Sequence, residues 1–392
     1  MKTVGEILSK WLQQCSKGMV DMEAVPRDDS GLDELMRLGA FERVVELAAS
    51  LGYQDDKTLI NRKFKQVRAL MSMKRYEEAL MSLGVILGCE TVALNMVDYL
   101  LLHLVRIEIY LQLDDELEAT AVIQELQNLP SGSFRGPDAM LRQFCCDKMA
   151  LKNLVLHNNY KASLAGLLHL LSKYGDSCTI RVIVLVDIIK MLMQMGGLNM
   201  CAHYVALLEN AVSELRSTAP SSSSSPVQDQ FIRSDRLIYH AEMTFAMARF
   251  ARGDIMTALE MLEKCVAKAK GFFRQDTREF GSPMIPETAS GLEDQVIYQS
   301  GAYLLSDAVN NIAVVLLHAK RIDDAILRLE QLVQSDPTSF LRHPVIFNLC
   351  TLYDLSCTPG VSDNKKRALH MLTKEYNVTA IEWSEFRITS TK

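Results

Sequence analysis

The feature that most constrains this chain is a repeated pair of apolar helical stretches joined by a short polar turn. In the clearest copy, Ala313 and Ala325 lie twelve positions apart, and Pro337 follows twelve positions after the second alanine. Small side chains let two antiparallel helices approach closely, and the larger apolar residues around them fill the groove towards the next helix. Proline has no backbone N–H to donate, so it ends the second helix. We therefore expect each copy to form a helix-turn-helix unit.

Similar units recur along the chain, with Ala246 and Ala258 again twelve positions apart and Pro130 closing the copy that contains Ala119. This pattern is typical of tetratricopeptide repeats, which are helix-turn-helix units of about 34 residues. In the last unit, residues 356–364 are expected to lengthen the turn between the two helices. The sequence predicts an all-α fold, a right-handed helical solenoid of tetratricopeptide-like helix-turn-helix repeats, with an irregular helical bundle as the alternative. The expected units are 25–58, 60–93, 100–133, 144–177, 182–215, 239–272, 306–339 and 343–380.

Interruptions divide the predicted array into parts. Residues 1–24 form an N-terminal helix or lead, and the N-terminal repeats occupy 25–215. A Ser/Pro-rich loop follows at 216–236, and the C-terminal repeats occupy 237–392 with a long insertion at about 271–300. Polar segments rich in Ser, Pro and Gly bury little apolar surface, so we interpret the loop and the insertion as surface segments between units. Phosphorylation or contact with a partner is the alternative role for both.

Charge and cysteine usage exclude several functional classes. The 42 Lys and Arg and 48 Asp and Glu residues are intermixed without a basic block, which argues against a nucleic-acid partner. The nine cysteines form no Cys-x-x-Cys pair, which favours reduced thiols inside the cell. Glu6 and Lys10 interrupt the first apolar residues, so we expect no signal peptide, and the longest apolar run, 182–186, is too short to cross a bilayer. We expect a cytoplasmic protein without direct membrane insertion.

Sequence motifs for catalysis are missing. The chain has no phosphate-binding glycine loop, no His-Glu-x-x-His and no Gly-x-Ser-x-Gly motif. Cys201 and His203 are two positions apart and fall on different helix faces, which favours packing over a metal site. We interpret Cys145-Cys146 as a buried pair rather than a reactive dithiol, and the acidic runs 114–116 and 323–324 as helix starts. The prediction is a protein that is not an enzyme and binds no cofactor or metal.

The predicted inner faces of the first helices supply the candidate binding residues. Chaperone-binding tetratricopeptide domains clamp a C-terminal carboxylate with Lys and Asn on these faces. None of the corresponding pairs in this chain combines Lys with Asn. The pairs are Phe64/Arg68, Leu104/Glu108, Lys148/Lys152, Met243/Met247 and Asn310/Val314. We therefore expect protein contacts through apolar residues within a polar rim. The candidates are Phe64, Arg68, Leu104, Met243, Met247 and Asn310.

A stretch near the C-terminal end, 307–355, carries a more specific pattern. It combines Asn310-Asn311, Ala313-Val314, Leu316-Leu317, Leu327, Asp336-Pro337, Phe347-Asn348-Leu349 and Tyr353, and Lys365-Lys366 follows before Ala368. With these residues the chain resembles the subunit 12 family of the transport protein particle (TRAPP) complex. The resemblance implies a non-catalytic subunit of a vesicle tether that acts between the endoplasmic reticulum and the Golgi apparatus and in autophagy. It also implies contacts with other TRAPP subunits, most of all subunit 11, and an indirect link to nucleotide exchange on Rab-family GTPases.

Two functional hypotheses follow. The first is a TRAPP scaffold subunit in the cytoplasm, peripherally associated with ER–Golgi membranes through its partners. The second is a stand-alone tetratricopeptide adaptor that recognises peptide motifs in a chaperone, import or ciliary setting. A scaffold subunit should travel in a large particle with several subunits, whereas an isolated adaptor should run as a monomer.

Overall fold

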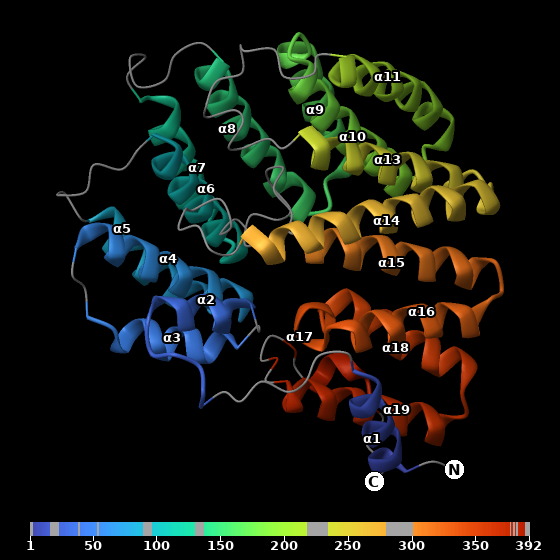
Figure 1. Ribbon diagram of the computed structural model, residues 1–392. Helices are drawn as coiled ribbons and strands as arrows, with labels where there is room; N and C mark the ends of the chain where they lie inside the picture. The colour runs from blue at the N-terminus through green and yellow to red at the C-terminus, as the bar shows by residue number, and fades with distance from the viewer. Residues whose placement is uncertain are drawn as a thin grey trace. The chain divides into compact units, whose positions relative to one another are not determined.

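The computed structural model describes residues 3–15, 23–37, 40–52, 55–88, 96–129, 137–217, 234–279, 301–376, 378, 381 and 383–388. Residues 218–233 of the Ser/Pro-rich loop and 280–300 of the insertion therefore lie outside the described residues. Within the described ranges the chain is helical and has no strand, as Figure 1 shows. The chain divides into two compact units, which are taken separately below.

The first unit comprises Met1–Glu78, Leu262–Arg278 and Gly301–Lys392. In it, α2 packs with α3 and α4, while α15, α16, α18 and α19 pack as successive neighbours. The short 3-10 helix η2 packs against α18 and α19. The elements of this unit are α1 (Val4–Gln14), α2 (Asp29–Arg37), α3 (Phe41–Ser50), α4 (Asp56–Ser72), most of α14 (Ile255–Glu279), α15 (Gly301–His318), α16 (Ile322–Ser335), α17 (Pro337–Phe340), α18 (His343–Ser356), α19 (Pro359–Glu375) and η2 (Trp383–Phe386).

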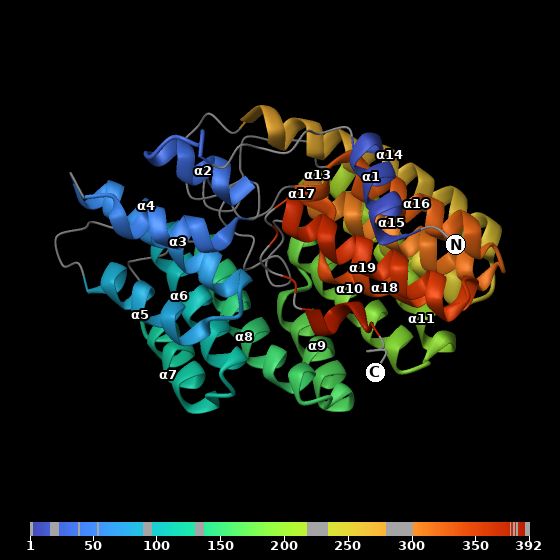
Figure 2. The same cartoon turned by 90° about the horizontal axis from the view of Figure 1, so that it is seen from below.

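The second unit comprises Ala79–Met261 and Glu279–Ser300. Consecutive helices pack against each other along the chain, in the order α6, α7, α8, α9, α10 and α11, and α13 then packs on both α10 and α11 (Figure 2). The elements of this unit are most of α5 (Tyr76–Leu87), α6 (Met96–Gln112), α7 (Glu116–Gln127), α8 (Pro137–Leu156), α9 (Tyr160–Tyr174), α10 (Cys178–Gln194), α11 (Leu198–Ser217) and α13 (Ser234–Ala251), with the start of α14.

The predicted all-α class and its tetratricopeptide-like helix pairs are confirmed. Each of the eight predicted ranges covers most of two consecutive helices, although several helices extend beyond the range, as α8 does by beginning at Pro137. The alanines used to place the units are buried, including Ala313 and Ala325 in the packed pair α15 and α16. Ala119, Ala246 and Ala258 are buried as well. Small side chains therefore occupy the contact positions, as the twelve-residue spacing requires.

One backbone conformation recurs in six of the turns between first and second helices. The residue two positions before the second helix is left-handed, with φ between 56° and 86°. The next residue donates its N–H to the carbonyl five residues earlier, as Arg321 does to Leu316 at 2.9 Å. This is the 6→1 hydrogen bond of a Schellman motif, which satisfies a carbonyl left free at the helix end. The six residues are Lys74, Asp114, Asn158, Gly196, Gly253 and Lys320.

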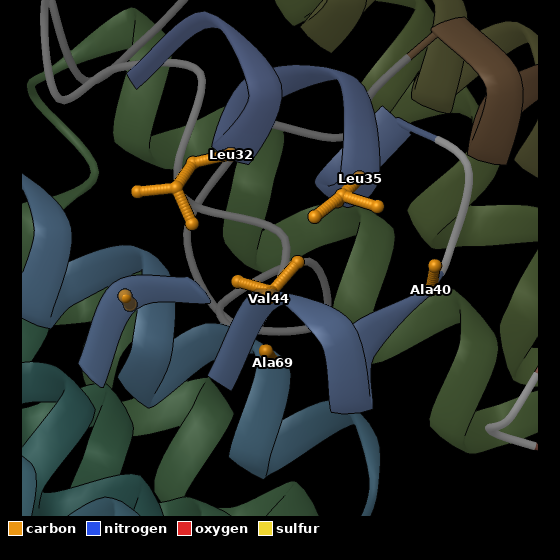
Figure 3. Close-up of a cluster of buried hydrophobic side chains, with 6 residues drawn as sticks. Leu32, Leu35, Ala40, Val44 and Ala69 are labelled. Atoms are coloured by element: carbon orange, nitrogen blue, oxygen red, sulfur yellow. The ribbon is translucent and has the colours of Figure 1, made fainter. Parts of the chain in front are cut away.

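A small hydrophobic cluster holds α2, α3 and α4 together (Figure 3). Leu32 and Leu35 of α2 face Val44 of α3, and Ala69 of α4 lies beneath them. Ion pairs reinforce the contact between α2 and α4, because the Arg62 Nε donates to Asp29 Oδ1 at 2.6 Å. The apolar cluster and the peripheral ion pair together fix the three helices.

The last repeat differs from the prediction in its turn. The expected lengthening over 356–364 is wrong, because α18 ends at Ser356 and α19 already begins at Pro359. Proline at the first helical position loses no hydrogen bond and has a preset φ, so Pro359 starts the helix rather than extending the turn. Pro337 acts in the same way: α16 ends at Ser335, and Pro337 opens the short helix α17, capped by the Asp336 carboxylate.

Helix α1 packs against α19 of the last repeat and against α16 of the repeat before it, although it lies at the other end of the sequence (Figure 1). Ile7, Leu8 and Trp11 are its buried residues. Residues 3–15 of the predicted N-terminal segment 1–24 thus contain a helix that covers the C-terminal repeats.

Candidate protein-binding surface

The six predicted binding residues divide into two groups by burial. Phe64, Leu104 and Met243 are buried, so they offer little side-chain surface to a partner. Arg68, Met247 and Asn310 are partly exposed. The role of all six in protein binding stays a prediction.

A charged contact joins the predicted inner faces of two successive first helices in the second unit. The Lys152 ammonium of α8 donates to both carboxylate oxygens of Glu108 of α6, each at 2.7 Å. Gln112, one turn further along α6, donates to Glu108 at 3.0 Å. Glu108 is buried, and these partners satisfy its charge and its lone pairs. The contact ties one repeat to the next.

A second contact of the same kind links α8 to α10. Lys148 lies one turn before Lys152 on α8, and its ammonium lies 2.8 Å from Asp187 Oδ2. Next to it on α13, burial and the nearby Lys190 lower the pKa of His240 to about 3, against the smaller opposing effect of Asp187. His240 is therefore neutral at physiological pH. We call Glu108, Lys148, Lys152 and Asp187 the charge ladder.

The charge ladder determines what the inner face of the second unit can bind. Both lysines that could hold a ligand carboxylate already face a carboxylate of the neighbouring repeat. A peptide C-terminus would have to displace Glu108 or Asp187, leaving a partly buried carboxylate without its partner, which is costly. The geometry therefore favours binding through shape and apolar contacts over capture of a free carboxylate. This pairing could not be predicted from local spacing, because Glu108 and Lys152 are 44 positions apart.

In the first unit, an amide pair takes the corresponding place between first helices. Asn348 Nδ2 of α18 donates to Asn310 Oδ1 of α15 at 2.8 Å. Asn310 is one of the predicted binding residues, and both asparagines belong to the pattern that carries the family resemblance. Their side chains hold two repeats together, which explains their presence without a ligand.

Exposed aromatic side chains gather near η2, where sequence reasoning had proposed no site. Phe347 of α18 is 43% exposed, and the Arg387 guanidinium lies 3.8 Å from its ring centroid. Trp383 is 51% exposed and packs edge-on against His370 of α19, with ring centroids 4.4 Å apart. Half-exposed aromatic and Arg side chains are typical of protein interfaces. In the sequence, the one indication of this surface was Trp383, a large aromatic residue within a polar C-terminal segment.

The remaining chemical candidates are structural. Burial raises the pKa of Cys145 to about 12 and that of Cys146 to about 11, so both remain protonated thiols near neutral pH. Cys201 is buried whereas His203 is exposed, which separates this pair. Asp115 caps α7 by accepting the Glu118 N–H at 3.2 Å, as expected for a helix start.

In the part of the chain that the structure describes, no cluster of three or more His, Cys, Asp or Glu side chains is arranged to hold a metal ion. None of the helices described combines the length and apolar character that crossing a bilayer requires.

Comparison with known proteins gives one short relationship in sequence. Over 62 residues, 16% of this chain, the sequence is 42% identical to trafficking protein particle complex subunit 12 of Homo sapiens and 40% identical to that of Mus musculus. The matched segment spans only 8% of the length of these relatives. No family model matches the chain.

Among solved structures, the similarities are broad but distant. A Rap protein complexed with competence and sporulation factor has a TM-score of 0.42 and 11% identity, over 95% of this chain and 92% of that one. The Cut9–Hcn1 hetero-tetramer of the APC/C has a TM-score of 0.40 and 11% identity, over 97% of this chain and 73% of that one.

Proposed function

We propose that this chain is a non-catalytic scaffold subunit of a TRAPP-type vesicle-tethering complex. The observation that carries the proposal is the match of 62 residues at 40–42% identity to subunit 12 of the human and mouse trafficking protein particle complexes. In this role the chain acts in traffic from the endoplasmic reticulum to the Golgi apparatus, with autophagy as a second setting. It reaches these membranes from the cytoplasm through its partners.

The helix pairs support a scaffold because each repeat adds surface without requiring a catalytic pocket. The partners are other TRAPP subunits, with subunit 11 the first candidate, and the link to Rab-family GTPases is indirect. The charge ladder supports binding to folded surfaces over binding to a peptide C-terminus, since Lys148 and Lys152 are already paired. This observation weighs against a chaperone-type adaptor, which is the competing function.

Affinity purification from cells with mass spectrometry tests the proposal. The tagged protein is expected to recover several TRAPP subunits in near-equal amounts and to elute from a sizing column as a large particle. A monomeric elution with a single chaperone or receptor, and without TRAPP subunits, would contradict the proposal and favour the adaptor.

A matched pair of variants tests whether the surface near η2 binds the TRAPP subunits. Trp383→Ala removes a half-exposed aromatic side chain near η2, and Leu117→Ser removes an 85% exposed leucine on α7. We expect Trp383→Ala to lower the recovery of TRAPP subunits and Leu117→Ser to leave it unchanged, because lone exposed leucines are common on protein surfaces. Loss with Leu117→Ser alone would assign the contact to the other unit.

A further inference from the structure

Helix α1 occupies a surface that the repeat architecture leaves open. The terminal unit of a helical array has one apolar face with no following repeat, and such a face needs a cover. Here α1 supplies it by packing against α19 and α16. Its buried residues Ile7, Leu8 and Trp11 lie at i, i+1 and i+4, on one face of the helix. We call the surface of α16 and α19 beneath them the α1 seat.

The helical form of α1 is specified within α1 itself. Thr3 and Glu6 form a reciprocal capping box, in which Glu6 N–H donates to Thr3 Oγ1 at 3.3 Å and Thr3 N–H donates to Glu6 Oε2 at 2.8 Å. Both partners belong to the segment, so the capping box requires no contact with the seat.

Polar contacts between α1 and its seat lie at the C-terminal end of the helix. Gln334 Nε2 of α16 donates to Gln14 Oε1 at 3.3 Å. Cys15 is hydrogen bonded to the Tyr376 side chain just after α19. A neutral amide pair and a thiol contact select weakly among sequences. Recognition then depends on the three apolar side chains, because amphipathic helices bind protein grooves through their apolar face.

We propose that the α1 seat is a helix-binding site, that α1 is its intramolecular occupant, and that an amphipathic helix of a partner subunit replaces it in the assembly. The partner helix presents large apolar residues in the spacing of Ile7, Leu8 and Trp11 and needs no charged anchor. The proposal rests on the proposed function in one respect, since it requires that the chain binds a protein partner. The free chain is closed by its own N-terminal helix.

The tether makes α1 a strong competitor. A covalently linked segment has an effective concentration on the order of 1 mM, so a seat that binds the free helix with a Kd of about 10 μM is occupied by α1 about 99% of the time. An added helix then binds the intact chain about 100-fold more weakly than it binds an open seat. A substitution that weakens the binding of α1 to its seat should therefore recover much of this 100-fold loss in affinity for the added helix.

Peptide binding in trans tests the seat directly. The probe is a fluorescein-labelled peptide of residues 1–15, with fluorescence anisotropy measured on the full chain and on its Trp11→Ala variant. We expect the peptide to bind the Trp11→Ala chain at least tenfold more tightly than the unmodified chain. The same peptide carrying Trp11→Ala should bind neither. Leu117→Ser, on a helix of the other unit, serves as the matched control and should behave like the unmodified chain.

Two outcomes would overturn the proposal: binding of the peptide to neither chain, or equal binding to both. Leu8→Ala is the second opening variant, and it covers the case in which Trp11→Ala disturbs folding, as judged from far-UV circular dichroism. If α1 is only a structural cap, both variants lose helical signal and neither gains affinity for the peptide.

Accessibility of Cys15 tests the exchange in the assembled particle. Cys15 follows α1 and contacts Tyr376 in the closed chain, so displacement of α1 should speed its alkylation by N-ethylmaleimide. We expect faster labelling in purified particles than in the isolated chain, and equal or slower labelling would refute the exchange. Failure to recover TRAPP subunits is a separate result: it would remove the proposed function while leaving the peptide measurement as it stands.

Discussion

The ion pair between Lys366 and Asp354 is unequally buried, so its two halves should respond differently to mutation. The Lys366 side chain is 2% exposed and the Asp354 side chain 44% exposed. The ammonium lies 2.6 Å from Asp354 Oδ1 and donates to the Arg387 carbonyl at 3.2 Å. Ser362 also donates to Asp354, at 2.6 Å. The pair thus joins α18, α19 and the residue after η2.

Removing either partner leaves a different defect. Asp354→Ala leaves a buried ammonium without its counter-charge, which costs about 3–5 kcal/mol. Lys366→Met leaves a carboxylate that water and Ser362 can reach, and the methionine keeps most of the buried volume, so the cost is about 1–2 kcal/mol. The aspartate variant should therefore be less stable than the lysine variant by about 2 kcal/mol. The double variant should recover part of the loss, because the unpaired charge is gone.

Hydrogen exchange on the amides of α18 and α19 is the measurement, since it reports local opening even if the two units unfold separately. Urea denaturation followed by circular dichroism gives the global comparison. Unequal burial would not explain the pair if Lys366→Met cost as much stability as Asp354→Ala, or if the double variant were less stable than Asp354→Ala alone. Ser362→Ala is the matched control, because it removes one hydrogen bond to Asp354 and no charge.

Three further predictions concern other parts of the chain. Lys320 and Gly253 both have a left-handed backbone, a conformation that only glycine adopts without strain. Lys320→Gly should therefore raise the free energy of unfolding by about 0.5–1 kcal/mol, whereas Gly253→Ala should lower it by about 1 kcal/mol. Thermal melts of the two variants provide the comparison. His240 is neutral in the folded chain with a pKa of about 3 but titrates near 6.5 when unfolded, so its stabilising contribution is complete above pH 6.5 and falls with acidity, by about 2 kcal/mol at pH 5. His240→Gln should flatten the stability profile between pH 7 and 5, and an unchanged slope would contradict this account. Cys145 should resist iodoacetamide at pH 8 in the folded chain while the partly exposed Cys357 reacts, as peptide mass spectrometry would show; equal rates would contradict the assigned burial.

Helix pairs were predictable because their signals are local. The alanine spacing, the apolar positions around it and the acidic helix starts all lie within one unit, and the structure has two helices in each expected range. The Schellman turns were less visible, because Lys74, Asp114 and Lys320 occupy positions where glycine would have been the clear signal. The turn before α19 was predicted to be too long for a similar reason, because Pro359-Gly360 is typical of a loop in sequence but begins a helix here.

The candidate surfaces depend on contacts that sequence spacing does not encode. Asn310 was predicted as a binding residue, and its hydrogen bond to Asn348 could not be foreseen, because Asn348 lies 38 positions away in the next repeat. Phe64, Leu104 and Met243 have the right helical periodicity, yet periodicity alone cannot distinguish an inner face that is open from one that the neighbouring repeat covers. The position of α1 could not be predicted at all, because one amphipathic helix fits many apolar faces.

The docking of α1 also sets an order in time during synthesis. The segment is translated well before its seat, because Gln334, its contact on α16, is 320 residues further along the chain, and α19 comes later still. At roughly 5–20 residues per second, the apolar face of α1 waits about 16–64 s for Gln334 and longer for α19. During that interval Ile7, Leu8 and Trp11 are open to chaperones, to other nascent chains and to premature contacts with the earlier repeats. Helix α1 thus reaches its native place only after α16 and α19 have been made.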